Sequence, residues 1–258
     1  MSATLERTLR PLAPVAFGLT LLIGWQAAVR GFAVPRILLP APSDIVSALS
    51  GHSFELWHDW QQTILRGALP GFAIGSASGF LIALAIQRWP AVSKGLVPLS
   101  ALFAAMPIIG IAPIMVMWFG FDWQSKAAVV ALMTFFPTLA MTGAGLATTD
   151  AIHLDLLRSY GASYGRTLWH LRLPSALPHI FTALKLGAPS SVIGSMIAEF
   201  FGTPTYGLGF RMSAEIGRLG FDVVWAAIVV AALSGSVLYG LIALSERFFT
   251  AWRPSNRS

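Results

Sequence analysis

The residues best suited to a chemical role lie between Asp155 and Pro174, in the polar and basic stretch DLLRSYGASYGRTLWHLRLP. Asp155 and Arg158 offer opposite charges, and hydroxyl groups and further arginines follow them. Apolar segments flank the stretch on both sides. The chemistry that it can offer is recognition, because a polar insert between apolar segments is where a membrane protein can meet a soluble partner.

Two short helices are predicted within this stretch. The spacing of apolar residues on either side of Gly161 is that of amphipathic helices and involves Leu156, Leu157, Tyr160, Tyr164 and Leu168. Gly161 and Gly165 allow the backbone to turn between the two helices. Pro174 is predicted to close the segment, because proline cannot continue a helix and restricts the residue before it.

Catalytic and metal-binding groups are not predicted elsewhere. The histidines lie in expected loops or interfaces without the spacing of metal ligands: His52, His58, His153, His170 and His179. The sequence has no cysteine, no G-x-x-x-x-G-K-[ST] phosphate-binding motif and no pair of carboxylates inside the expected spans. We therefore expect no metal site, no cofactor and no enzymatic activity. Any ATP that powers the protein must be bound by a separate subunit.

The composition is that of an integral membrane protein. Of 258 residues, 55% are hydrophobic and only 11% are charged, and the mean hydropathy is +0.70, which excludes a soluble globular domain. Apolar runs of about 20 residues indicate helices, since barrel strands would be about half as long. We predict an all-α, polytopic membrane protein with residues 1–258 as one transmembrane domain. Six spans are expected, at residues 11–29, 63–86, 96–118, 127–147, 177–200 and 223–245. The first run is too long for a signal peptide and is expected to be a retained span.

The charged residues assign the loops to the two sides of the membrane. With six spans both termini share a side, and an excess of basic residues marks the cytoplasm. That excess falls on the termini, the 87–95 turn and the 148–176 loop, and consists of Arg7, Arg10, Arg88, Lys94, Arg158, Arg166, Arg172, Arg247, Arg253 and Arg257. The other loops are balanced, with Arg30, Arg36, Arg66, Lys126, Arg211 and Arg218 against Asp44, Glu55, Asp59, Asp122, Glu215 and Asp222. Residues 1–10 and 148–176 are therefore predicted to be cytoplasmic, and residues 30–62 and 201–222 periplasmic.

A short amphipathic helix and a glycine stripe are expected around the start of the second span. Within residues 30–62, Ser43 is a possible helix N-cap, and the apolar side consists of Ile45, Val46 and Leu49. In the second span glycine recurs every fourth residue, at Gly67, Gly71, Gly75 and Gly79. Such a stripe lets another helix approach closely. The sequence leaves open whether that helix belongs to the same chain or to a second copy.

Prolines and two isolated charges are the candidates for a transport path. Pro107 and Pro113, beside Met106, interrupt the third span, and broken helices often line such a path. Kinks made for packing explain the prolines equally well. Glu199, near the outer end of the fifth span, is a candidate for an outer gate or a helix-terminal contact, or is simply an interfacial acid. Lys185 is expected to extend to the cytoplasmic interface.

The polar stretch resembles the cytoplasmic EAA loop of ABC-transporter permeases, which has the form Glu-Ala-Ala, three residues, Gly, nine residues and Ile-x-Leu-Pro. This chain matches that form at Gly161, Leu173 and Pro174, and differs from it at Asp155, Leu156, Leu157 and Leu171. Leu-Pro-x-Pro-Ser at residues 39–43 resembles the nitrate, sulfonate and taurine branch of these permeases.

The resemblance implies a type I ABC importer permease fold with a cytoplasmic coupling helix. The residues that it assigns to contact with the ATPase are Asp155, Arg158, Ser159, Tyr160, Gly161, Ala162, Ser163, Leu173 and Pro174. The Ala198–Glu199 pair also resembles the family's pattern, which implies an outer gate or a helix-terminal contact at Glu199. The family resemblance further implies that residues 201–222 lie at the outer gate, near a docked substrate-binding protein. The implied partners are two ABC ATPase subunits that bind ATP and Mg²⁺, a periplasmic substrate-binding protein and a second copy of the chain. The implied function is import of a small polar or anionic solute, such as nitrate, a sulfonate, taurine or a pyrimidine precursor, across the bacterial inner membrane.

Two other functions compete with this interpretation. A secondary transporter driven by an ion gradient predicts buried acids, unwound half-helices and internal repeats, and only Glu199 fits that prediction. A membrane-embedded enzyme needs polar catalytic groups that converge within the spans, and the sequence offers none. The isoelectric point near 10.3 reports topology and contact with anionic lipid rather than nucleic acid.

Overall fold

A computed structural model describes residues 13–89, 95, 102, 106–202 and 206–251. These residues form helices and contain no strand. In chain order the helices are α2 (Ala13–Gly31), α3 (Pro42–Gly51), α4 (Ser53–Trp60), the π-helix η1 (Gln61–Ala68), α5 (Leu69–Ile86), α7 (Ile108–Phe119), α8 (Trp123–Ala147), α9 (Ala151–Ser159), α10 (Tyr164–Thr167), the π-helix η2 (Leu168–Arg172), α11 (Leu173–Gly202), α12 (Leu208–Gly217) and α13 (Phe221–Phe249). The predicted all-helical membrane fold is confirmed.

Among the described residues, continuous helices long and apolar enough to cross a membrane cover Ala13–Gly31, Ser53–Ile86, Trp123–Ala147, Tyr164–Gly202 and Phe221–Phe249. They correspond to five of the six expected spans. Residues 96–101 and 103–105 of the third expected span, 96–118, lie outside the described residues, and most of its described part belongs to the 12-residue helix α7. Five expected spans therefore correspond to long apolar helices, and the third expected span is described in part.

The fifth span begins earlier than the sequence predicts. Helix runs without a break from Tyr164 through η2 and α11 to Gly202, so the expectation that Pro174 closes the segment is wrong. The wide turns of η2 end just before the proline. A π-helical turn shifts the hydrogen-bond register, which lets the helix continue past a residue that has no N–H to donate.

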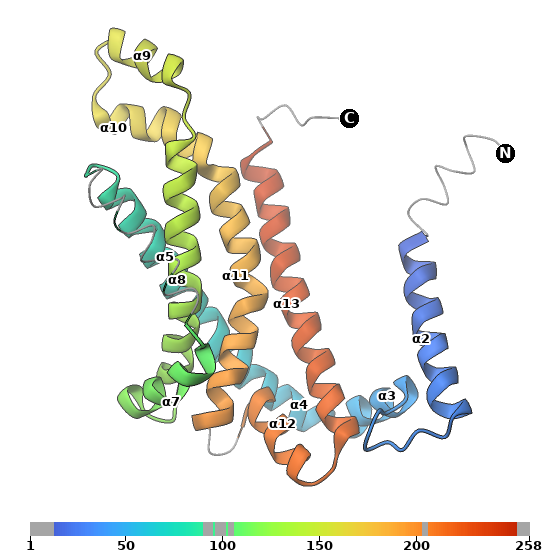
Figure 1. Ribbon diagram of the computed structural model, residues 1–258. Helices are drawn as coiled ribbons and strands as arrows, with labels where there is room; N and C mark the ends of the chain where they lie inside the picture. The colour runs from blue at the N-terminus through green and yellow to red at the C-terminus, as the bar shows by residue number, and fades with distance from the viewer. Residues whose placement is uncertain (1–12, 90–94, 96–101, 103–105, 203–205, 252–258) are drawn as a thin grey trace, which may run out of the picture.

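Figure 1 shows α5, α8, α11 and α13 as the body of the molecule, with the α9–α10 hairpin projecting from one end and α3, α4, α7 and α12 gathered at the other. We call these the hairpin end and the α12 end. Helix α2 stands apart along most of its length (Figure 1) and contacts the rest near α3 and α13, where the rings of Trp25 and Trp225 are 5.3 Å apart.

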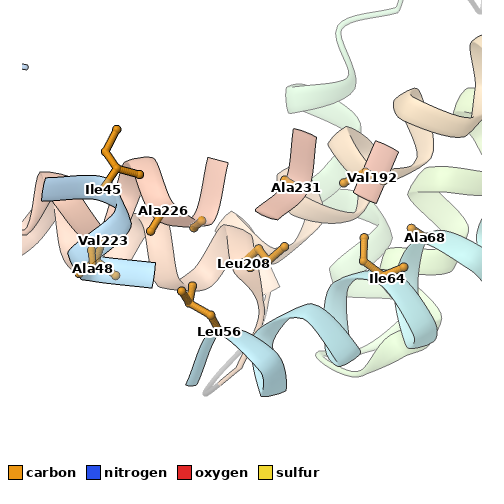
Figure 2. Packing of buried hydrophobic residues seen from close by; sticks show 11 residues of the cluster. Ile45, Ala48, Leu56, Ile64, Ala68, Val192, Leu208, Val223, Ala226 and Ala231 are labelled. Carbon is orange, nitrogen blue, oxygen red and sulfur yellow. The ribbon is translucent and has the colours of Figure 1, made fainter. Parts of the chain in front are cut away.

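The largest apolar cluster lies at the α12 end (Figure 2). Leu208 from α12 is fully buried there between Leu56 from α4 and residues of α13 such as Val223 and Ala226. Many of the cluster's members are alanine. Small side chains let helix backbones approach closely, which supplies contact area where lipid offers no hydrophobic reason for helices to associate.

The glycine stripe lies against α8 of the same chain. A Cβ atom added at Gly71 would come within 2.5 Å of Val130 Cβ, and one at Gly75 would meet the backbone of Ala131. Gly79 faces the Phe135 carbonyl in the same way. Gly67, in η1, faces the Ser195 hydroxyl on α11 and the Lys126 side chain. The three glycines of α5 thus set how closely α5 approaches α8.

The amphipathic helix in residues 30–62 is present as α3, but its cap differs from the prediction. Ala41 is the N-cap, and the Asp44 carboxylate accepts the Ala41 N–H at 3.2 Å. Ser43 lies inside the helix, where its hydroxyl accepts hydrogen bonds from Gln26 and Arg30. Val46, expected on the apolar side, is exposed. The helix begins two residues earlier because Pro42 suits the first helical position.

Candidate functional site

The α9–α10 hairpin is built by local capping. The Asp150 carboxylate accepts the Ile152 N–H at 3.0 Å and so starts α9. Gly161 then turns the chain with a φ of +66°, a conformation that glycine adopts without strain. The Ser163 hydroxyl accepts the Arg166 N–H at 3.4 Å and starts α10. Two helices flank Gly161 as predicted, whereas Gly165 lies inside α10 and not in the turn.

The residues expected to contact an ATPase divide into three groups. Asp155 and Arg158 lie on α9 and form an ion pair at 3.2 Å, with side chains 73% and 72% exposed. The next five, Ser159 to Ser163, form the end of α9, the turn and the cap of α10, so they make a corner and not the tip of one helix. Leu173 and Pro174 lie at the start of α11, where Leu173 packs against an apolar cluster around Leu146. The first two groups are largely exposed and open to a partner, whereas Leu173 and Pro174 are half-buried.

The hairpin is fastened to the body through α10. The Tyr164 hydroxyl donates to Gln87 Oε1 at 3.3 Å, and the Gln87 amide donates to the Leu146 carbonyl at 3.3 Å. The Arg88 guanidinium lies 5.8 Å from the centre of the Tyr164 ring, within the range of a cation–π contact. These contacts join α10 to the ends of α5 and α8. Helix α9 instead exposes apolar side chains of Ile152 and Leu156.

At the α12 end, Glu199 is the centre of a buried polar network. Its carboxylate accepts a hydrogen bond from Lys126 Nζ at 3.1 Å and one from the Gly209 N–H at 2.8 Å. The Thr63 hydroxyl donates to the same carboxylate and lies 2.9 Å from each oxygen. The Lys126 and Glu199 side chains are 4% and 0% exposed. Glu199 is therefore a buried contact between four segments and not an interfacial acid.

A second buried acid lies in the same network. Asp59 accepts the Gly207 N–H at 2.8 Å and Arg211 Nε at 2.7 Å, and its side chain is 0% exposed. Asp59 lies before the expected second span, 63–86, but belongs to the same continuous helix, Ser53–Ile86, so two buried acids meet at the α12 end. Lys126, expected in an outside loop, is in the first turn of α8.

Sequence reasoning missed Asp59, Thr63 and Lys126 as members of this site. Each lies at the edge of an apolar run in the sequence. Polar residues are common there, because the ends of a span reach the membrane interface. Lys185 pairs with Glu246 at 2.6 Å and so bridges α11 and α13, and its extension to the cytoplasmic interface stays a prediction. In each case the role of the residue depends on a partner that lies far away in the sequence.

The expected pathway residues are not brought together. Met106 lines a cavity of about 230 Å³ between α7, α8 and α11, together with Ile108, Phe136 and Ser190. Pro107 is the N-cap of α7, which begins at Ile108. Pro113 lies inside α7. Glu199 is absent from the lining of the cavity among the described residues.

Residues 71–250 match the family model described as the binding-protein-dependent transport system inner membrane component. The chain belongs to this family. A probable ABC transporter permease protein of Haemophilus influenzae is 32% identical to it, over 90% of this chain and 93% of the relative. The formylaminopyrimidine transport permease protein ThiX of Halalkalibacterium halodurans is 30% identical, over 96% of this chain and 99% of the relative. The taurine transport system permease protein TauC of Escherichia coli is 31% identical, over 90% and 86%.

The fold agrees with the family. The solved inward-facing structure of the MetNI methionine ABC transporter superposes with a TM-score of 0.57 at 19% identity, covering 78% of this chain and 96% of that chain. The protein is thus an ABC importer permease of the nitrate, sulfonate and taurine type, a membrane transport component and not an enzyme. The resemblance found at Gly161, Leu173 and Pro174 correctly indicated the family.

Proposed function

We propose that this ABC importer permease forms the path by which a small polar or anionic solute crosses the bacterial inner membrane, driven by ATP that a separate subunit hydrolyses. Nitrate, a sulfonate, taurine and a pyrimidine precursor are the proposed solute types. The observation that carries the proposal is the α9–α10 hairpin, whose α9 side is open while its α10 side is fastened to the body. The chain itself carries no nucleotide-binding motif and no cofactor of its own is proposed.

The proposed coupling surface consists of Ile152, Asp155, Leu156, Arg158 and Tyr160, with the corner residues Gly161 to Ser163. An amphipathic helix can lie in a groove of a soluble protein by its apolar face, and Tyr160 is 78% exposed. Because α10, η2 and α11 form one continuous helix, displacement of the hairpin by a docked ATPase would move a spanning helix. Coupling of this kind requires the docked states to differ in free energy. Leu173 and Pro174 are proposed to support that helix and not to touch the ATPase.

The proposed orientation follows the charges. The basic hairpin and both termini face the cytoplasm, and residues 30–62 and 201–222 face the periplasm, where a substrate-binding protein would dock. Anionic lipid would contact the basic side. Met106 and Pro113 are proposed to line the path, with Pro107 at the entrance to α7 and Glu199 near the outer gate.

A homodimer is the proposed assembly. Helix α2 is exposed along almost its whole length within one chain, with Val29 as its buried residue. A groove of about 610 Å³ between α11 and α13 is lined mainly by apolar or small side chains such as Ile193, Ala232 and Gly235. Two such unpartnered surfaces on one chain suit a second copy.

An ion-gradient transporter remains the weaker candidate. It predicts buried acids, and the chain has two, but Lys126 and Arg211 neutralise them. The family relationship favours ATP as the energy source.

The decisive experiment replaces exposed apolar side chains of α9 in the full-length chain. The double variant Leu156→Ser/Tyr160→Ser should lose a co-purifying ATPase subunit, because both side chains are exposed and available to a partner. Leu38→Ser, a 72% exposed leucine at the α12 end, serves as the matched control and should keep the ATPase. Retention of the ATPase by the α9 variant would contradict the proposed coupling surface. Loss in both variants would show that the effect is not specific to the hairpin.

A further inference from the structure

The N-terminus of α12 is bound to the spanning helices through three consecutive backbone amides. The N–H groups of Gly207, Leu208 and Gly209 donate to Asp59 Oδ1, the Thr63 hydroxyl and Glu199 Oε2, each at 2.8 Å. The first amides of a helix have no partner within the helix and carry its positive dipole end. Here their acceptors come from two other elements, the Ser53–Ile86 and Tyr164–Gly202 helices.

Thr63 joins the two acids into one unit. Its hydroxyl donates to Glu199 and accepts from Leu208, and its carbonyl accepts the Ser195 hydroxyl at 2.9 Å. Thr63 sits in the π-helix η1, whose wider turns shift the register of the residues that face α11 and α12. We call Asp59, Thr63 and Glu199, with the three amides that they bind, the α12 clasp.

The clasp requires close approach of the backbone. Gly207 has a φ of +141°, and a Cβ atom there would meet the Glu199 carboxylate. A Cβ atom at Gly209 would meet the backbone of Met196. A side chain at either position would push α12 away from the acids, so the two glycines are part of the clasp's geometry.

The charges of the clasp are balanced separately on its two sides. Lys126 neutralises Glu199 from within the body, while Arg211, on α12 itself, neutralises Asp59. Buried ion pairs contribute little net stability compared with apolar residues of the same size, because desolvation offsets their attraction. Their value here lies in fixing one position of α12. If α12 moved away, Glu199 would keep Lys126 as its partner, and the freed amides and Asp59 could be hydrated from the adjacent aqueous side.

We propose that α12 is a lid that can be released from the spanning helices at this end of the molecule. Asp59 and Thr63 are positioning residues that hold the lid closed until a step of the transport cycle opens it. The proposal rests on the proposed function for the driving step, since ATP binding by the partner supplies the free energy. The far end of α12 leads into Leu219, which is 61% exposed with a φ of +62°. A non-glycine residue in this conformation is strained, which suits a corner that changes shape when α12 moves.

A single reporter cysteine tests the lid, because the chain has no cysteine of its own. Met212 lies on α12, partly buried against the apolar cluster, so Met212→Cys should react slowly with a membrane-impermeant maleimide while the lid is closed. Ser213→Cys, exposed on the same helix, reports the fast rate. Adding Thr63→Val should accelerate labelling of Met212→Cys about ten-fold, the effect of removing one or two buried hydrogen bonds.

Matched variants separate the clasp from general loosening. Thr142→Val removes a hydroxyl that is equally buried but has no hydrogen-bond partner among the described residues, so it should leave the labelling rate unchanged. Thr63→Ser keeps the hydroxyl and should restore slow labelling. Equal rates with Thr63→Val and with the parent, or equal acceleration by Thr142→Val, would overturn the clasp.

The release step is tested on the complex purified with its ATPase. Adding ATP and Mg²⁺ should accelerate labelling of Met212→Cys, and an unchanged rate in a complex that hydrolyses ATP would overturn release. If no ATPase co-purifies but Thr63→Val still accelerates labelling and Thr142→Val does not, the clasp stands and the proposed function fails. The two conclusions can therefore fail independently.

Discussion

The two ends of the molecule use the same charged chemistry in opposite ways. At the hairpin end, Asp155 and Arg158 form an ion pair whose side chains are almost three-quarters exposed. At the α12 end, Glu199 and Lys126 form a pair at a similar distance whose side chains are almost fully buried. The exposed pair is screened by water and contributes little to folding, so its residues remain available to a partner. The buried pair is committed to one internal geometry.

The largest expected effect comes from breaking the buried pair. Lys126→Met leaves the Glu199 carboxylate buried without its cation, which should lower the free energy of unfolding by about 3–5 kcal/mol. Thermal unfolding in detergent, followed by size-exclusion chromatography, measures the loss. Arg158→Met at the hairpin end is the matched control and should change stability by less than about 1 kcal/mol. Similar losses in both variants would contradict the contrast between the two ends.

The double variant Lys126→Met/Glu199→Gln sharpens the same comparison. It removes both charges while keeping the side-chain volumes, so most of the stability lost in Lys126→Met should return. A double variant as unstable as the single one would mean that Lys126 acts through packing and not through the charge of Glu199.

Packing between α5 and α8, which run between the two ends, should be the next most sensitive to substitution. Gly75→Ala places a methyl group against the backbone of Ala131 and the Thr134 side chain, and backbone cannot move aside cheaply. We expect a loss of about 1–3 kcal/mol in the same unfolding measurement, as for other overpacked sites. Gly143→Ala, where an added Cβ meets nothing within 4 Å, is the control and should be tolerated. Tolerance of Gly75→Ala would show that α5 and α8 can separate.

A smaller effect is expected at the corner of the hairpin. Gly161→Ala forces a side chain into a left-handed conformation, at a cost of about 1–2 kcal/mol, although nothing lies within 4 Å of the added Cβ. The strain should reshape the corner and reduce transport per ATP hydrolysed in reconstituted vesicles, while the spans stay folded. Gly165→Ala, inside α10, should be neutral or slightly stabilising. Unchanged coupling in Gly161→Ala would overturn the role of the corner.

The smallest effect on stability should follow Asp155→Asn. The variant removes an exposed pair within one helix, so the unfolding temperature should stay almost unchanged. Binding of the ATPase, measured by co-purification at low and high salt, should weaken more at low salt if Asp155 faces a cation of the partner. A large loss of stability would show that Asp155 has a structural partner in the assembled complex.

Much of the architecture follows from local features of the sequence. Five of the six expected spans coincide with long apolar helices, and the turn at Gly161 separates two helices as its spacing predicts. The errors share one cause. Pro174 was expected to end a helix and Ser43 to cap one, yet each expectation considered a residue without the register that its neighbours impose. A π-helical turn or a shift of one or two residues at a helix start changes the role of a residue without changing the pattern.

The sequence by itself determined the membrane class, the family and the exposed hairpin, because apolar run length, charge balance and short-range spacing act within a few helical turns. The tertiary structure alone decided the partners of the isolated charges. Lys126 and Glu199 are 73 residues apart, Thr63 and Glu199 are 136 apart, and Asp59 and Gly207 are 148 apart. No local pattern relates such positions, because the cost of burying each charge is offset only when folded helices bring its partner within hydrogen-bond distance.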